Sequence, residues 1–249
     1  MKRKSVLLGI VVLSALVISP AWRQQQDKKD IAAYVIKVVK DVKKKAGGST
    51  TGWQQAIPLD QLKSGHLIQT ETGSFALIKF SDETKLLVRE KSEVEIKGQV
   101  QGKQVLDRDV HTTRGNVGFD VKKQEKESFR FSSPLSVASI RGTTGSYTRL
   151  DQINTDQLTI GNGLATFTNL LSNQSVDVGS HQTGITDDKG TLNVRTSTNQ
   201  EHSQTTTSVP GHDETPATDT QNQKKQHELR FTAEDKSGNR KTVVIYWDE

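Results

Sequence analysis

The stretch SSPLSVASIRGTTGSY, from Ser132 to Tyr147, contains the most strand-like run of the chain. Small and β-branched residues over 136–140 predict a short β-strand. The tripeptide Arg141-Gly142-Thr143 ends this run, and a second strand is expected over 146–150. Gly142 indicates a point where the backbone turns or passes close to another strand. The stretch therefore predicts a fold built from short strands and tight turns.

Similar runs recur outward from this stretch, roughly 8–12 residues apart, with no convincing helix between them. They cover 74–80 (SFALIKF), 85–88, 93–97, 105–110, 115–121 (GNVGFDV), 129–132, 136–140, 146–150, 157–160, 164–169 and 175–178. This pattern predicts an all-β fold, a β-sandwich, roll or barrel of about a dozen short strands.

The alternation of residues within these runs predicts the buried face. Val117, Phe119 and Val121 alternate with small or polar residues, which is typical of a strand with one buried face. In 74–80 both faces carry apolar residues, which predicts a strand covered on both sides. The segment 31–39 fits a helix by its spacing and a strand by its β-branched residues, and we favour the strand.

Three stretches that follow one another resemble the FecR protein domain family. They are TETGSFALIKFSDETKLLVREKSEVEI (70–96), TTRGNVGFDVKK (112–123) and FRFSSPLSVASIRGTTGSY (129–147). Pro134 stands at the T-P position of the family pattern, and Arg141, Gly142 and Thr143 stand at its R-G-T position. Asp82-Glu83 replaces a D-G turn, so we expect a different type of turn there.

The resemblance extends over about 31–186 and implies a set of structural signature residues. They are Gly65, Gly115, Pro134, Arg141, Gly142 and Thr143. Gly65 opens a segment similar to G-D-x-I-x-T, in which His66 replaces the acidic residue. For Arg141 we expect hydrogen bonds from the guanidinium to carbonyls or a carboxylate, in a fork geometry that lysine cannot copy. Ligand recognition is the alternative role for this arginine.

The N-terminus resembles a secretory signal. Basic residues over 2–4 precede the apolar run SVLLGIVVLSALVIS (5–19), and small residues precede a possible cut after Ala21. The length of the run also permits a retained anchor. Either reading of residues 1–21 predicts an extracytoplasmic protein, which is periplasmic, secreted or anchored to the membrane through this segment.

Composition excludes several classes of function. Without the three basic residues of the signal, 31 basic residues face 29 acidic ones, a net charge of +2, which removes the main argument for nucleic-acid binding. The chain has no cysteine, so disulfides and thiolate chemistry are excluded. No catalytic or cofactor-binding motif is present. His202, His212, Asp213, Glu214 and His227 lie in a polar tract where a metal site is disfavoured by entropy. We therefore predict a protein that is not an enzyme and has no cofactor or metal.

The C-terminal part differs in composition from the rest. We place the β domain at 31–196, a disordered polar linker at 197–226 and a β-hairpin at 227–249. In the hairpin, Leu229, Phe231 and Ala233 alternate, as do Val243, Ile245 and Trp247. A lone hairpin is marginally stable, so we expect it to dock on the main domain or on a partner.

The resemblance implies a sensing or interaction module of the bacterial cell envelope. In the namesake regulators, such a domain receives a signal from an outer-membrane receptor and passes it to a sigma-factor-binding segment in the cytoplasm. Only 1–4 precede the apolar run here, so such a cytoplasmic segment is not expected. The expected partner is another envelope protein, bound through sheet edges. The alternative is a cell-wall or polysaccharide-binding protein, and an exposed Trp53 would favour it.

Overall fold

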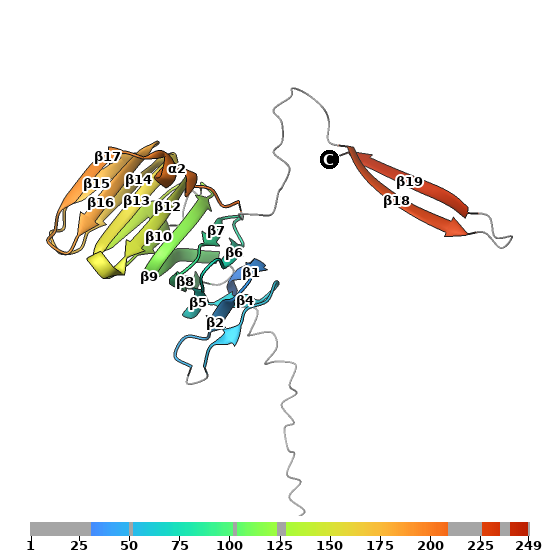
Figure 1. Cartoon of the computed structure of the whole chain (residues 1–249), viewed down its shortest axis with the longest axis horizontal. Helices are drawn as coiled ribbons and strands as arrows, with labels where there is room; N and C mark the ends of the chain where they lie inside the picture. The colour runs from blue at the N-terminus through green and yellow to red at the C-terminus, as the bar shows by residue number, and fades with distance from the viewer. Residues whose placement is uncertain are drawn as a thin grey trace, which may run out of the picture. The chain divides into compact units, whose positions relative to one another are not determined.

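The computed structural model describes residues 31–49, 52–101, 104–123, 128–208, 226–234 and 240–248 (Figure 1). The chain divides into two units, residues 1–209 and residues 210–249, and each is described by itself. The residues predicted as a signal, 1–21, and most of the predicted linker lie outside the described residues. No helix in the described part of the chain is long and apolar enough to cross a membrane.

Strands dominate the first unit. Its strands are β1 (Ile31–Val39), β2 (Val42–Lys45), β3 (Gln54–Gln55), β4 (Gln61–Lys63), β5 (His66–Thr70), β6 (Phe75–Phe80), β7 (Lys85–Val88), β8 (Glu93–Gln101), β9 (Gln104–Val121), β10 (Ser128–Ser132), β11 (Ser136–Ile140), β12 (Thr143–Leu150), β13 (Thr155–Asn162), β14 (Leu164–Asn169), β15 (Ser175–Gly179), β16 (Gln182–Asp187) and β17 (Leu192–Thr196). The described part of this unit also contains a 3-10 helix η2 (Asp151–Ile153) and a helix α2 (Asn199–Ser203). The all-β prediction is confirmed, and the strands are more numerous than the dozen expected because several are only two to five residues long.

The strand pairings form two ladders that share β9. Sheet A runs in the order β4-β1-β6-β7-β9-β12-β13-β16-β17. Sheet B runs in the order β3-β2-β5-β8-β9-β10-β11-β14-β15. Figure 1 shows β9, β10, β12 and β13 lying side by side. Of the pairings between described strands, that of β9 with β10 is parallel, and the others are antiparallel.

Gly115 lets β9 pass from one sheet to the other. Residues 107–114 of β9 pair in sheet B, and residues 115–121 pair with β7 and β12 in sheet A. Gly115 has φ +92°, and a Cβ there would lie 2.1 Å from Oγ of Ser92. Only glycine fits this corner. The two strands predicted over 105–110 and 115–121 are therefore one strand, which changes sheets without a loop.

The core lies between the two sheets. Phe119 of sheet A stacks on Phe131 of sheet B with ring centroids 4.7 Å apart, and Tyr147 of sheet A contacts Phe131 and Phe167 at 5.8 and 6.4 Å. Val117, Phe119 and Val121 are buried, as their alternation predicted. Other alternating positions of the expected strands are also buried, namely Ala76, Ile78, Phe80, Phe129, Phe131, Leu158, Ile160, Ala165, Phe167 and Val178. The second face of β6 is half-buried rather than covered.

The first unit extends past residue 196, where the sequence predicted the linker to begin. Residues 197–206 run across sheet A, and α2 begins with a capping box between Thr198 and Glu201. Arg89 donates hydrogen bonds to the carbonyls of Gln204 and Thr206 at 3.1 and 2.9 Å. A Cβ on Gly118 would lie 2.7 Å from the Thr206 carbonyl oxygen. The segment is ordered by hydrogen bonds to the sheet, which its polar composition does not reveal.

The turn predicted at Asp82-Glu83 and the predicted C-terminal hairpin are both present in the structure. Asp82-Glu83 joins β6 and β7, and Glu83 takes a φ of 69°. Glu83 thus adopts the left-handed backbone conformation at a position where the D-G turn would have a glycine. In the second unit, β18 (Gln226–Glu234) and β19 (Arg240–Asp248) pair in antiparallel fashion, with residue 229 opposite 245 and 231 opposite 243. The hairpin prediction is confirmed.

Candidate functional site: a groove beside a buried polar cluster

The Ser-Ser-Pro stretch forms the tight turn between β10 and β11. Oγ of Ser133 accepts hydrogen bonds from the backbone N–H groups of Leu135 and Ser136, at 2.9 and 3.1 Å. The backbone N–H of Ser133 donates to the Ser136 carbonyl at 2.9 Å. Pro134 is exposed at the tip, where its fixed φ suits a turn. The motif thus shapes a turn and points the Ser133 hydroxyl inward.

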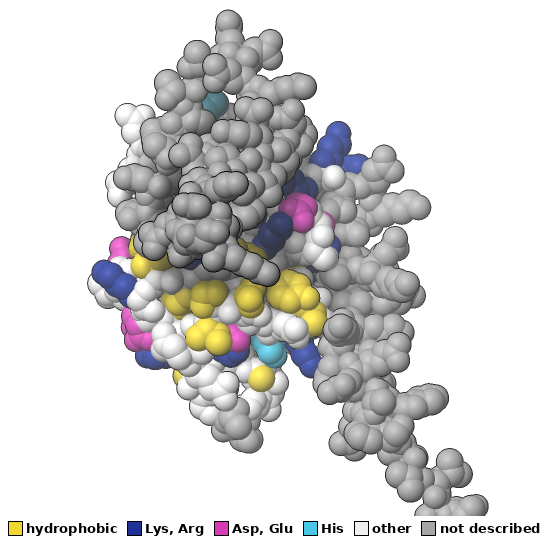
Figure 2. Space-filling model, turned by 90° about the vertical axis from the view of Figure 1, so that its right-hand side faces the viewer, with side chains coloured by type: hydrophobic (Ala, Val, Ile, Leu, Met, Phe, Trp, Pro, Cys, Tyr) yellow, Lys and Arg dark blue, Asp and Glu magenta, His cyan; other side chains and the backbone are white. Residues whose placement is uncertain are grey.

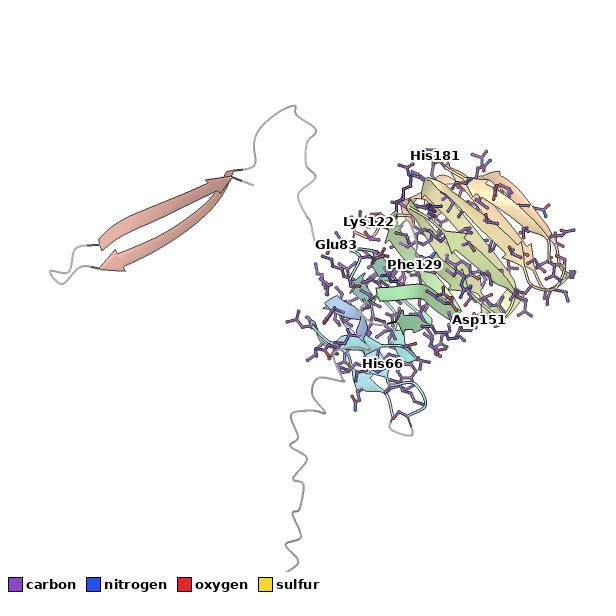
Figure 3. All side chains as sticks on the ribbon, turned by 180° about the vertical axis from the view of Figure 1, so that it is seen from behind. His66, Glu83, Lys122, Phe129, Asp151 and His181 are labelled. Atoms are coloured by element: carbon purple, nitrogen blue, oxygen red, sulfur yellow. The ribbon has the colours of Figure 1, made fainter. Side chains whose placement is uncertain are left out.

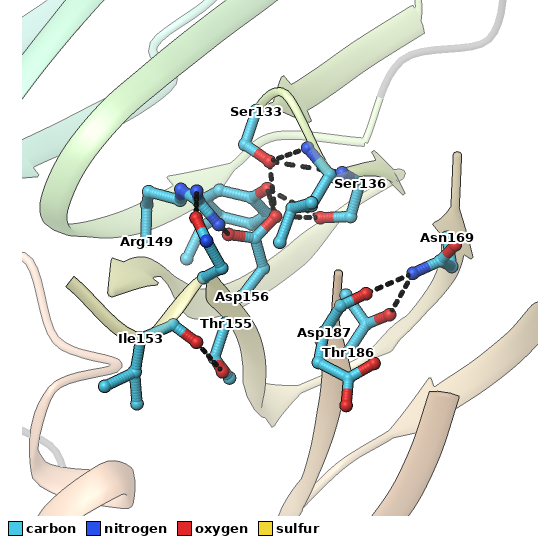
Figure 4. Close-up of polar contacts among 12 residues, drawn as sticks. Ser133, Ser136, Arg149, Ile153, Thr155, Asp156, Asn169, Thr186 and Asp187 are labelled. Carbon is cyan, nitrogen blue, oxygen red and sulfur yellow. Dashed lines mark hydrogen bonds and ion pairs between the residues drawn. The ribbon is translucent and has the colours of Figure 1, made fainter. Parts of the chain in front are cut away.

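This hydroxyl belongs to a buried polar cluster formed by Ser133, Ser136, Tyr147, Arg149 and Asp156, of which Figure 4 labels all but the tyrosine. Oδ2 of Asp156 accepts hydrogen bonds from Oγ of Ser133, from Oγ of Ser136 at 2.6 Å and from the Tyr147 hydroxyl at 3.1 Å. Asp156 is completely buried. The cluster joins the β10–β11 turn in sheet B to β12 and β13 in sheet A.

Arg149 compensates the charge of Asp156. Its Nη1 lies 3.1 Å from Oδ1 of Asp156, with 6% of the arginine side chain and none of the aspartate side chain exposed. Its Nη2 donates to Oδ1 of Asn154 at 3.0 Å. Burial, followed by the charge of Asp156, raises the pKa of Tyr147 well above its ordinary value, so the phenol stays protonated and donates to the carboxylate.

A groove of ≈ 550 Å³ lies beside the polar cluster. Its walls come from the end of β5, the loop before β8, the corner of β9, the end of β12 and η2. The lining residues are Thr70, Glu71, Lys91, Arg114, Gly115, Arg149, Leu150, Asp151, Gln152 and Ile153. Figure 3 places Asp151 at the opposite end of the strands from Lys122 and His181. Arg149 therefore connects the cluster to a surface site.

The structure spreads the six signature residues over several places. Gly115 lines the groove, and Gly65, with φ +87°, lines a separate hollow of ≈ 420 Å³ near Asp107, Asp109 and Arg130. Pro134 lies in the turn that contributes Ser133 to the polar cluster. Sequence reasoning missed Tyr147, Arg149 and Asp156, because their partners lie on other strands.

The Arg141-Gly142-Thr143 tripeptide forms the turn from β11 to β12. Gly142 has φ +65°, and a Cβ there would lie 2.8 Å from Cβ of Lys123, as its predicted role requires. Thr143 is buried and donates to the Leu164 carbonyl at 3.0 Å. Arg141 is exposed, and its side chain has no hydrogen bond or ion pair with the described residues. The hydrogen-bonding role that we expected for Arg141 is therefore not found in the described part of the chain.

A second surface feature is apolar. Figure 2 shows hydrophobic side chains grouped on the face that it presents. The large hydrophobic residues that are exposed include Tyr34 and Ile36 on β1, and Ile57 and Leu59 in the loop before β4. Leu59 has φ 71° and is 77% exposed. Exposed apolar groups gathered on one face are typical of interaction surfaces.

The histidines and carboxylates do not assemble into a metal centre within the described ranges, where no group of three such side chains is close enough to hold an ion. His202 lies against His181 instead, with ring centroids 4.9 Å apart. His212, Asp213 and Glu214 lie outside the described residues.

Part of the chain is similar to a known protein family and to solved structures. Residues 66–162 match the family described as FecR protein. Two crystal structures of a protein from Parabacteroides distasonis ATCC 8503 assigned as an anti-sigma factor are similar, at 12% sequence identity and TM-scores of 0.47 and 0.46. The matched part covers 54% of this chain and 61% of those chains, less than two thirds of their length. Among curated proteins, none matches the sequence.

Proposed function

Because residues 66–162 match the FecR family, we propose that the chain is a non-catalytic, extracytoplasmic interaction and sensing module of the bacterial cell envelope, which binds a protein partner. The observation that carries the proposal is the FecR match itself. The resemblance implies a domain that receives a signal through contact with another protein. The apolar N-terminal run supports a location outside the cytoplasm.

The surface of the domain offers features suited to a protein partner. The last strands of the two ladders, β15 and β17, each pair on one side only with a described strand. An open sheet edge carries unpaired backbone donors and acceptors that another chain can use. The exposed apolar residues on β1 and before β4 support the same proposal.

The test is a gentle crosslinking of the full chain in the envelope of its native cells, followed by purification and mass spectrometry. The proposal predicts a reproducible protein partner and a mature N-terminus at Trp22 or an intact anchored one. The control bait is an unrelated envelope protein purified in the same way, which should not recover the partner. Recovery of the same proteins with the control bait, or of no protein at all, would contradict the proposal.

Binding to a cell-wall glycan is the second candidate, and Trp53 favours it. This side chain is 36% exposed, which makes it available as a stacking platform for a sugar ring. Glycan that co-purifies with the wild-type chain and is lost in Trp53→Ala, but retained in Tyr34→Ala, would support this candidate. Retention in both variants would exclude Trp53 as the platform.

A further inference from the structure

A second hollow, of ≈ 340 Å³, lies where β11 ends and β14 begins. It shares no lining residue with the groove beside the polar cluster. Its apolar lining comes from Phe129, which Figure 3 labels, and from Ile140, Leu164 and Ala165. Leu164 is 56% exposed, whereas the other three belong to the buried core. Leu164 therefore provides the main apolar surface that a ligand in this hollow can reach.

Arg141 supplies the charge of the hollow. It is the one charged residue among the described residues that line it. Its side chain is exposed and forms no hydrogen bond or ion pair with a described residue. Asp177, opposite Thr166 in the lining, accepts a hydrogen bond from the Thr166 hydroxyl at 2.9 Å instead. The guanidinium thus offers accessible donors to a group that brings acceptors.

The backbones that carry Arg141 and Leu164 are tied together. The buried hydroxyl of Thr143 donates to the carbonyl oxygens of Leu164 and Arg141, at 3.0 and 3.3 Å. A Cβ on Gly163 would lie 2.9 Å from this hydroxyl, so the two turns pack closely at that point. A cation and an apolar side chain held side by side before binding lose less conformational entropy when a ligand arrives.

These features select an occupant with a carboxylate beside an apolar group. A carboxylate matches the donor fork of a guanidinium, and an apolar group packs on Leu164. The rim of the hollow is shallow, because Ser139, Arg141, Leu164 and Thr166 are all exposed. Sites for free small molecules bury most of the ligand surface, and anionic membranes are bound by clusters of about four to eight cations. A side chain projecting from a protein surface meets neither limit.

We infer that the hollow formed by Arg141 and Leu164 receives an acidic residue and a neighbouring apolar residue of the protein partner. The partner's carboxylate pairs with the guanidinium of Arg141, and its apolar side chain covers Leu164. Arg141 thereby has a binding role in place of the hydrogen-bonding role first expected. This inference rests on the proposed function, since it requires a protein partner.

A photo-crosslinking residue at Ser139 in the full chain locates the occupant. Ser139 lines the hollow and is exposed, and the matched control carries the same residue at Lys189, an exposed position between β16 and β17. In native envelope, position 139 should crosslink to a protein segment that contains Asp or Glu within two residues of a large apolar residue. Position 189 should not crosslink to this segment.

A synthetic peptide with the sequence of that segment tests the two contacts separately. Its affinity for the purified full chain should fall about tenfold in Arg141→Ala, as for a lost hydrogen bond from a charged group. Leu164→Ala should weaken it about fivefold through lost apolar contact, and Lys189→Ala should leave it unchanged. When the acidic residue of the peptide is replaced by its amide, Arg141→Ala should weaken binding no further.

The outcomes separate this inference from the proposed function. A protein partner that crosslinks elsewhere on the first unit but not at position 139, or a peptide that binds Arg141→Ala as tightly as wild type, overturns the inference and leaves the proposed function standing. A lipid or glycan crosslinked at position 139 also overturns the inference. Failure of every position to crosslink to a protein contradicts the proposed function as well.

Discussion

The Asp156→Ala substitution is expected to destabilise the first unit severely. Asp156 is fully buried, and Arg149, its ion-pair partner, is 6% exposed. Removing the carboxylate leaves the buried guanidinium uncompensated, which typically costs about 3–5 kcal/mol. The hydroxyls of Ser133, Ser136 and Tyr147 also lose their acceptor. Because domains are stable by only about 5–15 kcal/mol, the variant should lose a large part of its stability.

Urea unfolding of the full chain, followed by circular dichroism, measures the effect. Asp120→Ala is the matched control, since Asp120 pairs with Lys122 at the surface, where an ion pair contributes at most about 1 kcal/mol. The double variant Arg149→Met/Asp156→Leu should recover the part of the loss that comes from the unpaired guanidinium, while the three hydroxyls still lack their acceptor. If Asp156→Ala and Asp120→Ala unfold at the same urea concentration, the reasoning about the cluster is wrong.

Three further predictions concern other parts of the first unit. Gly115→Ala should cost about 1–3 kcal/mol in urea unfolding through overlap with the neighbouring strand, and Gly52→Ala, with open space around it, should cost far less; equal effects would contradict the corner at β9. Hydrogen bonding from Arg195 lowers the pKa of Glu201 from 4.5 to about 2, so the attachment of α2 should be complete above about pH 4.5 and weaken as the pH falls towards 2. Hydrogen exchange of α2 against pH measures this change, and a Glu201→Gln variant with the same pH dependence would refute it. Arg141→Ala should change the stability by less than about 0.5 kcal/mol, as for most surface substitutions, and a clear drop in thermal stability would restore the role first expected for this arginine.

Alternation along the strands predicted the core because it is a local property of the chain. Val117, Phe119 and Val121 face inward at every second position, so the buried face could be read directly. The continuity of β9 could not be read from the sequence, because residues 111–114 are polar and resemble a loop. Thr112 is in fact completely buried. A strand that changes sheets pairs with different strands along its length, so no single pattern of residues marks it.

The candidate site was only partly predictable. The Ser-Ser-Pro turn and the need for glycine at position 142 follow from local chemistry. Local chemistry does not reveal that Asp156 is the hydrogen-bond acceptor of Ser133. Asp156 follows a turn-like stretch, and its burial depends on pairing with Arg149 on the neighbouring strand. A carboxylate and an arginine seven residues apart in a β-hairpin were the available signal.

The ordered structure just after residue 196 could not be predicted either, for a related reason. Its Ser, Thr and Gln content indicates a linker, yet Arg89 binds its backbone carbonyls and Gly118 leaves room for them. Backbone recognition leaves no trace in the composition of the bound segment.

Hydrogen–deuterium exchange of the full chain, with and without the crosslinked partner protein, tests the central claim most directly. The account predicts that the partner slows exchange within the first unit, which contains the residues that match the FecR family. Slower exchange confined to the C-terminal hairpin, with the first unit unchanged, would show that the first unit is not the part that binds.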